Sequence, residues 1–392
     1  MKNIVIDCLA SFWQLTTHVI FAKKAQVMFY YPQHFNRTAE GTNPFFDRLL
    51  EACDRHGISY KLIEEPDWGT DKPRNSKAIK GDALFLLIMV LRKVIGLFGK
   101  KDFFKNEKYV AGIVNILTFG RLRYNTYMTI SGSMLHLFGA LNSKGNVYDV
   151  QHGILFKQKA TFFDEKEHLR PQYYQRNLHW IMWGRGYDQC FCRGDEEILS
   201  GRTHVVGYPI KDVVMDMNSS DDNEKSVLFS LQFTHDSQPH ELKIQKDLVE
   251  ESLHQLNECR VKVLLRHHPR YNNAIDINDL LEKYPFAKLT TLSMNKLLAS
   301  TLLQVTFNST TSFEYAAYGI PSFFIDKEAS IPLGDIFYSE YHYPLYQGEE
   351  ILDVVKRLQN SELRRQDSAT VKEWYREFYD EFDENAFIKL IK

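Results

Sequence analysis

The chain has little cysteine, and the cysteines that it has follow no pattern. Its 392 residues include five, which are Cys8, Cys53, Cys190, Cys192 and Cys259. Their odd number and irregular spacing exclude a disulfide framework as a simple interpretation. Cys190 and Cys192 form one C-x-C pair, and no second pair is present to complete a zinc site. We therefore expect reduced thiols, as in a cytoplasmic protein, and no bound metal.

The chain also lacks a net positive charge, a membrane-spanning run and a signal peptide. The formal net charge is −2, so no overall positive field attracts nucleic acid. No run reaches the roughly 18 apolar residues of a membrane span, and the first ten residues do not form a signal peptide. We expect a cytoplasmic protein. The segment 83–105 mixes apolar residues with five lysines and arginines. It fits a core helix with a solvated basic end, which we favour, or a helix lying on the inner membrane.

The length favours two domains of roughly 150–200 residues each. The polar stretch Met217–Lys225 has no apolar periodicity and is the expected linker. We assign residues 1–212 to an N-terminal acceptor-side domain and 213–368 to a C-terminal donor domain. Residues 369–392 are expected to form a C-terminal helix that could pack back on the first domain.

Strands and helices alternate along both halves, which predicts an α/β fold with parallel sheets covered on both faces. The first strand is expected at Lys2–Cys8, and another at Asn146–Val150. In the second half, strands are expected to end near Leu231, Arg266 and Phe307. Ligands bind beyond the carboxyl ends of such strands, so the loops that follow these three residues should share one binding edge.

A cluster of short polar residues follows the strand that ends at Phe307: Asn308, Ser309, Thr310 and Thr311. A helix is expected to begin there. Hydroxyl groups and free backbone N–H groups at the start of a helix bind anions. Plain N-capping is the alternative, although it needs only one hydroxyl. We predict that this cluster binds a phosphate.

A basic turn, Arg266-His267-His268-Pro269-Arg270, follows another strand. Pro269 fixes the turn and keeps the preceding residue extended. Arginine and histidine at this edge suit a nucleotide phosphate or a sugar carboxylate, whereas the alternative is a basic surface turn. The hydroxyl cluster on a loop of the same edge favours donor binding.

Two loops supply candidate catalytic groups. Gln151-His152-Gly153 follows the strand at 146–150, and Gly153 permits a tight turn. His152 either faces a cleft between the domains or is a structural turn histidine. The loop after Leu231 carries Gln232 and Asp236, and a carboxylate there can act as a base or a nucleophile.

These segments resemble known enzymes. Arg266-His267-His268-Pro269 resembles the His-Pro motif of bacterial sialyltransferases and related enzymes that use cytidine-monophosphate sugars, and Asn308–Thr311 resembles their Ser-Ser/Thr motif. Gln151-His152-Gly153 resembles a loop of capsule and surface-polysaccharide glycosyltransferases. The acidic motif of the sialyltransferases is absent, so the pattern is closer to the bacterial retaining β-Kdo transferases. The resemblance covers mainly residues 146–326.

This resemblance implies a GT-B-like fold, with two Rossmann-type domains and a cleft between them. It implies transfer of Kdo from CMP-Kdo to a saccharide or lipid-linked acceptor of bacterial lipopolysaccharide or capsule, without a metal. Asp236 would be the nucleophile, and His152 or Glu165 would deprotonate the acceptor. The donor-binding residues would be Arg266, His268, Pro269, Asn308, Ser309, Thr310, Thr311 and Gln232. A sialyltransferase, a CDP-glycerol-type transferase and a non-catalytic glycan-binding protein remain as alternatives.

Overall fold

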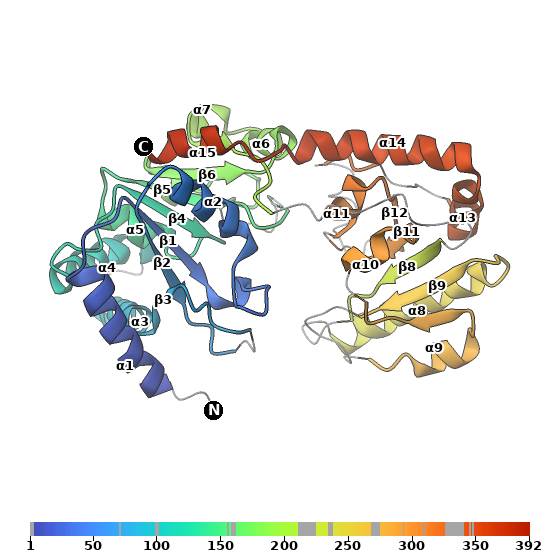
Figure 1. Ribbon diagram of the computed structural model, residues 1–392, viewed down its shortest axis with the longest axis horizontal. Helices are drawn as coiled ribbons and strands as arrows, with labels where there is room; N and C mark the ends of the chain where they lie inside the picture. The colour runs from blue at the N-terminus through green and yellow to red at the C-terminus, as the bar shows by residue number, and fades with distance from the viewer. Residues whose placement is uncertain are drawn as a thin grey trace. The chain divides into compact units, whose positions relative to one another are not determined.

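The computed structural model describes residues 4–69, 72–98, 102–154, 157, 162–210, 225–233, 238–267, 275–292, 294–307, 309, 311–325, 341–344, 346 and 349–392. The chain divides into two units (Figure 1). The first comprises Met1–Lys211 together with Tyr379–Lys392, and the second comprises Asp212–Phe378. Each unit contains one parallel sheet with helices packed against it.

The sheet of the first unit has seven strands in the order β3-β2-β1-β4-β5-β6-β7. They are β1 Val27–Pro32, β2 Tyr60–Glu65, β3 Ile79–Lys80, β4 Thr126–Ile130, β5 Asn146–Val150, β6 Leu178–Met182 and β7 Thr203–Val205. The helices are α1 Ile4–Leu15, α2 Pro44–Arg55, α3 Asp82–Phe98, α4 Phe103–Leu117, α5 Leu135–Leu141, α6 Arg185–Cys192, α7 Glu196–Leu199 and α15 Glu384–Ile391. Single helical turns occur at η1 Thr16–Ile20, η2 Gln33–Phe35 and η3 Pro171–Tyr173.

Helices cover both faces of this sheet, because successive side chains of a strand point to opposite faces. On one face, Phe29 of β1 packs edge-on against Phe46 of α2, with ring centres 5.3 Å apart. On the other, Tyr30 packs against Phe138 of α5 at 5.1 Å. All six residues of β1 are buried, which explains why the strand is a continuous apolar run without alternation.

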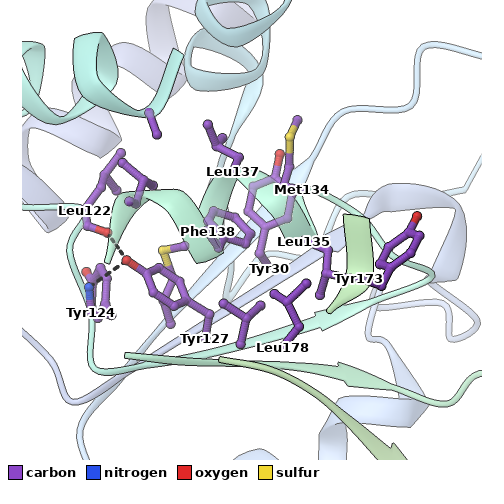
Figure 2. Packing of buried hydrophobic residues seen from close by; sticks show 14 of the residues in the cluster. Tyr30, Leu122, Tyr124, Tyr127, Met134, Leu135, Leu137, Phe138, Tyr173 and Leu178 are labelled. Carbon is purple, nitrogen blue, oxygen red and sulfur yellow. Dashed lines mark hydrogen bonds between the residues drawn. The ribbon is translucent and has the colours of Figure 1, made fainter. Parts of the chain in front are cut away.

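A buried tyrosine joins α5 to the sheet (Figure 2). The ring of Tyr127 in β4 stacks on Phe138 with centres 5.0 Å apart. Its hydroxyl donates to the Leu122 carbonyl oxygen at 2.8 Å and accepts from the Tyr124 backbone N–H at 2.9 Å. The phenol therefore lies in the core without an unpaired polar atom, and it holds the chain entering β4 in place.

The sheet of the second unit has five strands in the order β10-β9-β8-β11-β12. They are β8 Ser226–Ser230, β9 Lys262–Arg266, β10 Ala287–Leu289, β11 Thr301–Thr306 and β12 Ser322–Phe324. The helices are α8 Pro239–Leu256, α9 Asn278–Lys283, α10 Met294–Leu298, α11 Thr311–Ala317, α13 Ile351–Gln359 and α14 Ser361–Phe378. In both units the strand order reverses beside the first strand, between β1 and β4 and between β8 and β11. Doubly wound sheets bind ligands at such switch points.

The strand predicted at Lys2–Cys8 is wrong, because its described residues 4–8 lie in helix α1. Its large exposed residues Val5, Leu9 and Phe12 recur at helical spacing. A short apolar run does not by itself distinguish a strand from a helix. The strand at the centre of the sheet is β1, which begins at Val27.

The single helix expected over 369–392 is also wrong. Helix α14 ends at Phe378 and α15 begins at Glu384. Between them, the backbone N–H of Asp380 donates to the Trp183 carbonyl oxygen at 2.9 Å, and the Tyr208 N–H donates to the Asp380 carbonyl oxygen at 2.9 Å. These tertiary hydrogen bonds replace helical ones. Helix α15 then packs against α2.

Candidate functional site

Gln232, Ser309 and Thr311 lie beyond the carboxyl ends of β8 and β11, which are neighbours in the second sheet. The hydroxyl of Thr306, at the end of β11, lies 3.1 Å from the side-chain oxygen of Gln232 and 3.1 Å from the Ser230 carbonyl oxygen. The loop after β8 is thus tied to the end of β11. Gln232 therefore lies at the switch point, as expected of a ligand-binding residue.

One buried amide orders the hydroxyl groups of this edge. The Gln304 side chain donates to Ser230 Oγ at 3.0 Å and to Thr311 Oγ1 at 2.6 Å, and it accepts from Ser322 Oγ at 3.1 Å. Thr311 Oγ1 lies 2.8 Å from Ser309 Oγ. The Thr311 hydroxyl is thus engaged inside the protein, and we infer that it positions Ser309.

Ser309 also caps helix α11, since its hydroxyl accepts from the Thr311 backbone N–H at 3.3 Å. The capping alternative and the binding prediction therefore apply to the same residue. The sequence analysis missed Gln304. The available signal was a polar residue in the apolar strand Leu302-Leu303-Gln304-Val305. A fully buried amide needs partners, and here its partners are the hydroxyls of the edge.

Arg266 ends β9 and is half-buried. Its Nε donates to the Leu292 carbonyl oxygen at 3.1 Å. His267 follows it, and burial lowers the pKa of this ring. The other predicted residues of this edge, His268, Pro269, Asn308 and Thr310, lie outside the described residues, as does Asp236.

The loop that carries His152 is fixed by its neighbour Gln151. The Gln151 side chain accepts from the Trp183 backbone N–H at 2.9 Å and donates to the Gly153 carbonyl oxygen at 2.9 Å. Its own N–H donates to the Ile181 carbonyl oxygen at 3.0 Å. The carboxyl ends of β5 and β6 are thereby joined around His152.

The ring of His152 is half-buried and packs edge-on against Phe35, with centres 5.2 Å apart. Burial, with a smaller contribution from the nearby His34 and Arg37, lowers its pKa to about 4. Among the described residues, no side chain hydrogen-bonds to this ring. A histidine with so low a pKa is neutral near pH 7 and can accept a proton.

A half-buried and a buried carboxyl group, Glu65 and Asp149, lie at the same edge of the first sheet. Glu65 ends β2 and accepts from the Ser133 hydroxyl at 2.8 Å. Asp149 in β5 accepts from the Gly132 backbone N–H at 2.9 Å. Burial raises the pKa of both, that of Asp149 to about 7. The sequence analysis did not single out either residue, although both interrupt or end apolar strands.

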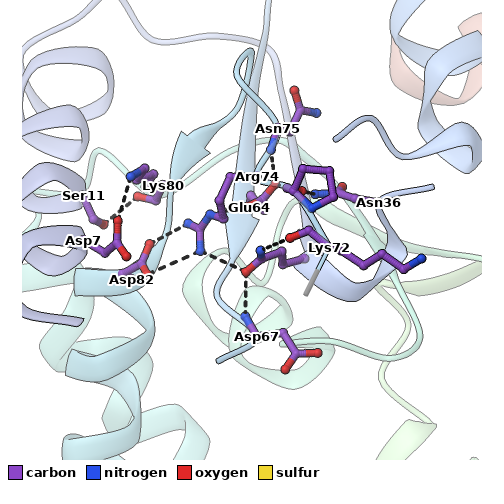
Figure 3. A network of polar contacts seen from close by, with 12 residues as sticks. Asp7, Ser11, Asn36, Glu64, Asp67, Lys72, Arg74, Asn75, Lys80 and Asp82 are labelled. Atoms are coloured by element: carbon purple, nitrogen blue, oxygen red, sulfur yellow. Dashed lines mark hydrogen bonds and ion pairs between the residues drawn. The ribbon is translucent and has the colours of Figure 1, made fainter. Parts of the chain in front are cut away.

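A network of ion pairs closes the loop after β2 (Figure 3). Arg74 lies 2.5 Å from Glu64 Oε1 and 2.6 Å from Asp82 Oδ2. Glu64 also accepts from the Asn36 side chain at 3.0 Å and from the Asn75 backbone N–H at 2.8 Å. Its carboxylate is therefore fully engaged in holding the edge together, and we assign it a structural role.

Glu165 lies elsewhere in the first unit. It is exposed on a turn between Phe163 and Leu169, which form an isolated bridge. The backbone N–H of Leu169 donates to the Asp195 carboxylate at 2.8 Å, so the turn is anchored near α7. Among the described residues, no hydrogen bond or ion pair links Glu165 with His152.

No sequence-family model and no curated protein sequence matches the chain. Solved structures do match. A wall teichoic acid polymerase, TagF, soaked with CDPG, is 16% identical with a TM-score of 0.53, and the match covers 100% of this chain and 93% of that one. A UDP-GlcNAc 2-epimerase from Neisseria meningitidis, bound to UDP-GlcNAc, is 10% identical with a TM-score of 0.55, over 93% and 99% of the two chains. Its counterpart from Methanocaldococcus jannaschii is 12% identical with a TM-score of 0.53, over the same shares.

At these identities the likeness shows the fold alone. It extends over the whole chain, and the two parallel sheets are those of a GT-B fold. The predicted fold class, an α/β chain of two Rossmann-type domains, is confirmed.

Proposed function

We propose that this protein is a cytoplasmic transferase of surface-glycan synthesis that uses a cytidine-nucleotide donor. The observation that carries the proposal is the gathering of Gln232, Ser309 and Arg266 at the carboxyl edge of a Rossmann-type sheet. The full-length likeness to TagF supports it, because that structure was soaked with CDPG.

On the donor side, the phosphates would lie against Ser309, Gln232 and Arg266. His268, Pro269, Asn308 and Thr310 keep their predicted donor-binding roles. Hydrogen-bond donors that are already positioned where negative charge develops stabilise a leaving phosphate. Gln304 would keep the hydroxyl of Ser309 oriented through Thr311. The proposal requires no metal ion.

On the acceptor side, we assign the general base to His152 in preference to Glu165. His152 is neutral at physiological pH because burial lowers its pKa, and its loop is held in place by Gln151. Glu165 lies on an exposed turn. A positioned base of this kind removes the proton of an attacking hydroxyl.

Two donors fit this arrangement, and we put a CDP-linked polyol first. In that case the acceptor oxygen bonds to the phosphorus that carries the polyol. The bond from this phosphorus to the bridging oxygen breaks, CMP leaves with the electron pair, and the proton goes to His152. CMP-Kdo is the second donor, favoured by the motifs at Arg266–Pro269 and Asn308–Thr311. Asp236 would then attack the anomeric carbon, whose bond to the CMP phosphate oxygen breaks so that CMP leaves with the electron pair and a glycosyl-enzyme forms, as with carboxylates in glycosidases. The acceptor hydroxyl would then displace the Asp236 carboxylate and give its proton to His152.

The test incubates the full chain and a lipid-linked oligosaccharide acceptor with CDP-glycerol, CMP-Kdo, CMP-sialic acid or UDP-GlcNAc. Released nucleotide is measured by chromatography. CMP release from CDP-glycerol, with a new phosphodiester signal in phosphorus NMR, supports the first donor. A normal rate of the Asp236→Asn variant supports it too.

CMP release from CMP-Kdo alone, with a sugar adduct on the protein by mass spectrometry, selects the second donor. The His152→Asn variant should bind donor with unchanged affinity and turn over at least 100-fold more slowly, because general bases contribute about 10²–10⁴-fold. If calorimetry shows that the pure protein binds no nucleotide, the proposed function is wrong.

A further inference from the structure

The exposed large apolar side chains are concentrated in one part of the first unit. Among the described residues there are 23 such side chains, and 18 of them lie within 4–21, 86–97 and 103–119. These ranges correspond to α1 with η1, α3, and α4 with the turn that follows it. Soluble proteins rarely expose apolar residues in such concentration without a binding partner.

On each helix these residues form a stripe. Val5, Leu9 and Phe12 of α1 follow the spacing i, i+4, i+7, as do Val90, Val94 and Leu97 of α3. On α4, Tyr109, Ile113 and Ile116 repeat the same spacing. The opposite sides of α3 and α4 contribute Ile88 and Val110, among others, to the core. Segment 83–105 is therefore not simply the core helix that we favoured from the sequence.

The three helices are neighbours. Helix α3 packs against both α1 and α4 (Figure 1). Their stripes lie away from the core cluster that each helix helps to bury. We call the exposed side of α1, α3 and α4 the apolar face. Among the described residues, no helix is long and apolar enough to cross a membrane.

The charges of these segments are almost all positive at the surface. Within 4–24, 82–98 and 102–123 the acidic residues are Asp7, Asp82, Asp102 and Glu107. Each is in an ion pair, with Lys80, Arg74, Lys105 and Arg92 respectively. Six exposed cations form no ion pair with any described residue: Lys23, Lys24, Lys93, Lys108, Arg121 and Arg123.

We propose that the apolar face binds the surface of an anionic lipid membrane. Apolar stripes enter the boundary between headgroups and acyl chains, while lysines and arginines attract anionic headgroups. Trp13 and Tyr109, which are 69% and 66% exposed, are the residue types that gather at membrane interfaces. A second copy of this chain fits less well, since a two-fold interface would bring Lys93 and its counterparts together.

The test is flotation of the full chain with lipid vesicles and without any nucleotide, so its result is separate from that of the transferase assay. Vesicles of phosphatidylcholine alone are compared with vesicles containing 30% phosphatidylglycerol, a composition chosen to give an anionic surface. The wild type should float at least five-fold more with the anionic vesicles. Trp13 emission should be quenched by brominated lipid, and the W13F variant should lose that part of the signal.

The decisive variant is V90E/V94E, which places two carboxylates beside Lys93. Its control, I244E/L292E, adds the same charges to the second unit at similar exposure: Val90 and Val94 are 50% and 45% exposed, and Leu292 and Ile244 are 48% and 42% exposed. Both should keep the wild-type circular dichroism, since none of the four side chains is buried. Flotation should fall at least ten-fold in V90E/V94E alone.

The proposal is overturned if wild-type protein does not float with anionic vesicles, or if both double variants float like the wild type. It is also overturned if sedimentation without lipid reveals a dimer that V90E/V94E dissociates, because the apolar face would then be an interface between copies of the chain.

Discussion

Acid should slow the proposed transferase reaction only at a much lower pH than it would slow a reaction that used an ordinary histidine base. The pKa of His152 is about 4, because burial penalises the charged ring and because His34 and Arg37 are nearby. At pH 5.5 a base with a pKa of about 4 is roughly 97% neutral, whereas one at the usual value near 6.5 is only about 9% neutral. The two cases therefore differ about ten-fold in the fraction of neutral base at that pH, and hence in the share of its own plateau rate that each reaction retains.

The assay is kcat/KM for CMP release between pH 4.5 and 8, with circular dichroism at each pH to exclude unfolding. We expect little loss from protonation of His152 down to pH 5.5, and a decline below pH 5. Burial raises the pKa of Asp149 to about 7, so any change of kcat/KM near pH 7 that comes from this carboxyl group should disappear in D149N. The asparagine side chain keeps an acceptor for the Gly132 N–H. An acid limb between pH 6 and 7 that persists in D149N would refute the assignment of His152 as the base.

Three other changes test the fold and the donor edge. Gly207→Ala should lower the free energy of unfolding by about 2–4 kcal/mol, because φ is +88° and a Cβ would lie 2.1 Å from the Glu381 carbonyl oxygen. The control is Gly201→Ala, where φ is +69° and a Cβ would enter open space. In urea unfolding it should cost only about 1–2 kcal/mol. Gln304→Leu should weaken CMP binding about ten-fold in calorimetry, since the hydroxyls that it orders lose their partner, and unchanged affinity would remove it from the donor site. Burial lowers the pKa of His136 to about 4. The contribution of the neutral His136 ring to the free energy of unfolding is therefore complete above pH 6.5 and is lost as pH falls towards 4. At pH 5 this costs about 2 kcal/mol, and His136→Phe should lose that much less stability between pH 7.5 and 5.

The sequence predicts the second unit better than the first. In the second unit, β8, β9 and β11 end within a residue of the predicted Leu231, Arg266 and Phe307, whereas in the first unit β5 has its predicted bounds but the first strand is missed. These strands are apolar runs bounded by clear polar turns. α1 was missed because a short apolar run does not reveal its period, and the break at Tyr379–Asp383 was missed because hydrogen bonds to Trp183 and Val206 decide it. Such bonds join residues far apart in the chain, so no local pattern contains them.

The residues of the candidate site also fall into those that local sequence could place and those that depend on the tertiary structure. The positions of Ser309 and Arg266 at strand ends could be predicted, because polar residues there directly follow apolar runs. Their role in donor binding stays a prediction. Gln304, Glu65 and Asp149 could not be predicted, because their importance depends on which strands become neighbours. A glutamine in the middle of a strand is informative only once β8 is known to lie beside β11.

The carboxyl edge of the first sheet, where we propose that the acceptor binds (the acceptor edge), and the apolar face are joined within the first unit. Ser11 of α1 donates to the Lys80 carbonyl oxygen at 2.6 Å and accepts from the Ala83 backbone N–H at 2.9 Å. Asp82, the first residue of α3, is paired with Arg74, which also pairs with Glu64 at the end of β2. Both helices are thus fastened where the acceptor edge begins. A membrane that binds their exposed stripes would present a lipid-linked acceptor to the unit that carries His152. On this argument, loss of vesicle binding should slow transfer to a lipid-linked acceptor and leave transfer to its soluble analogue unchanged.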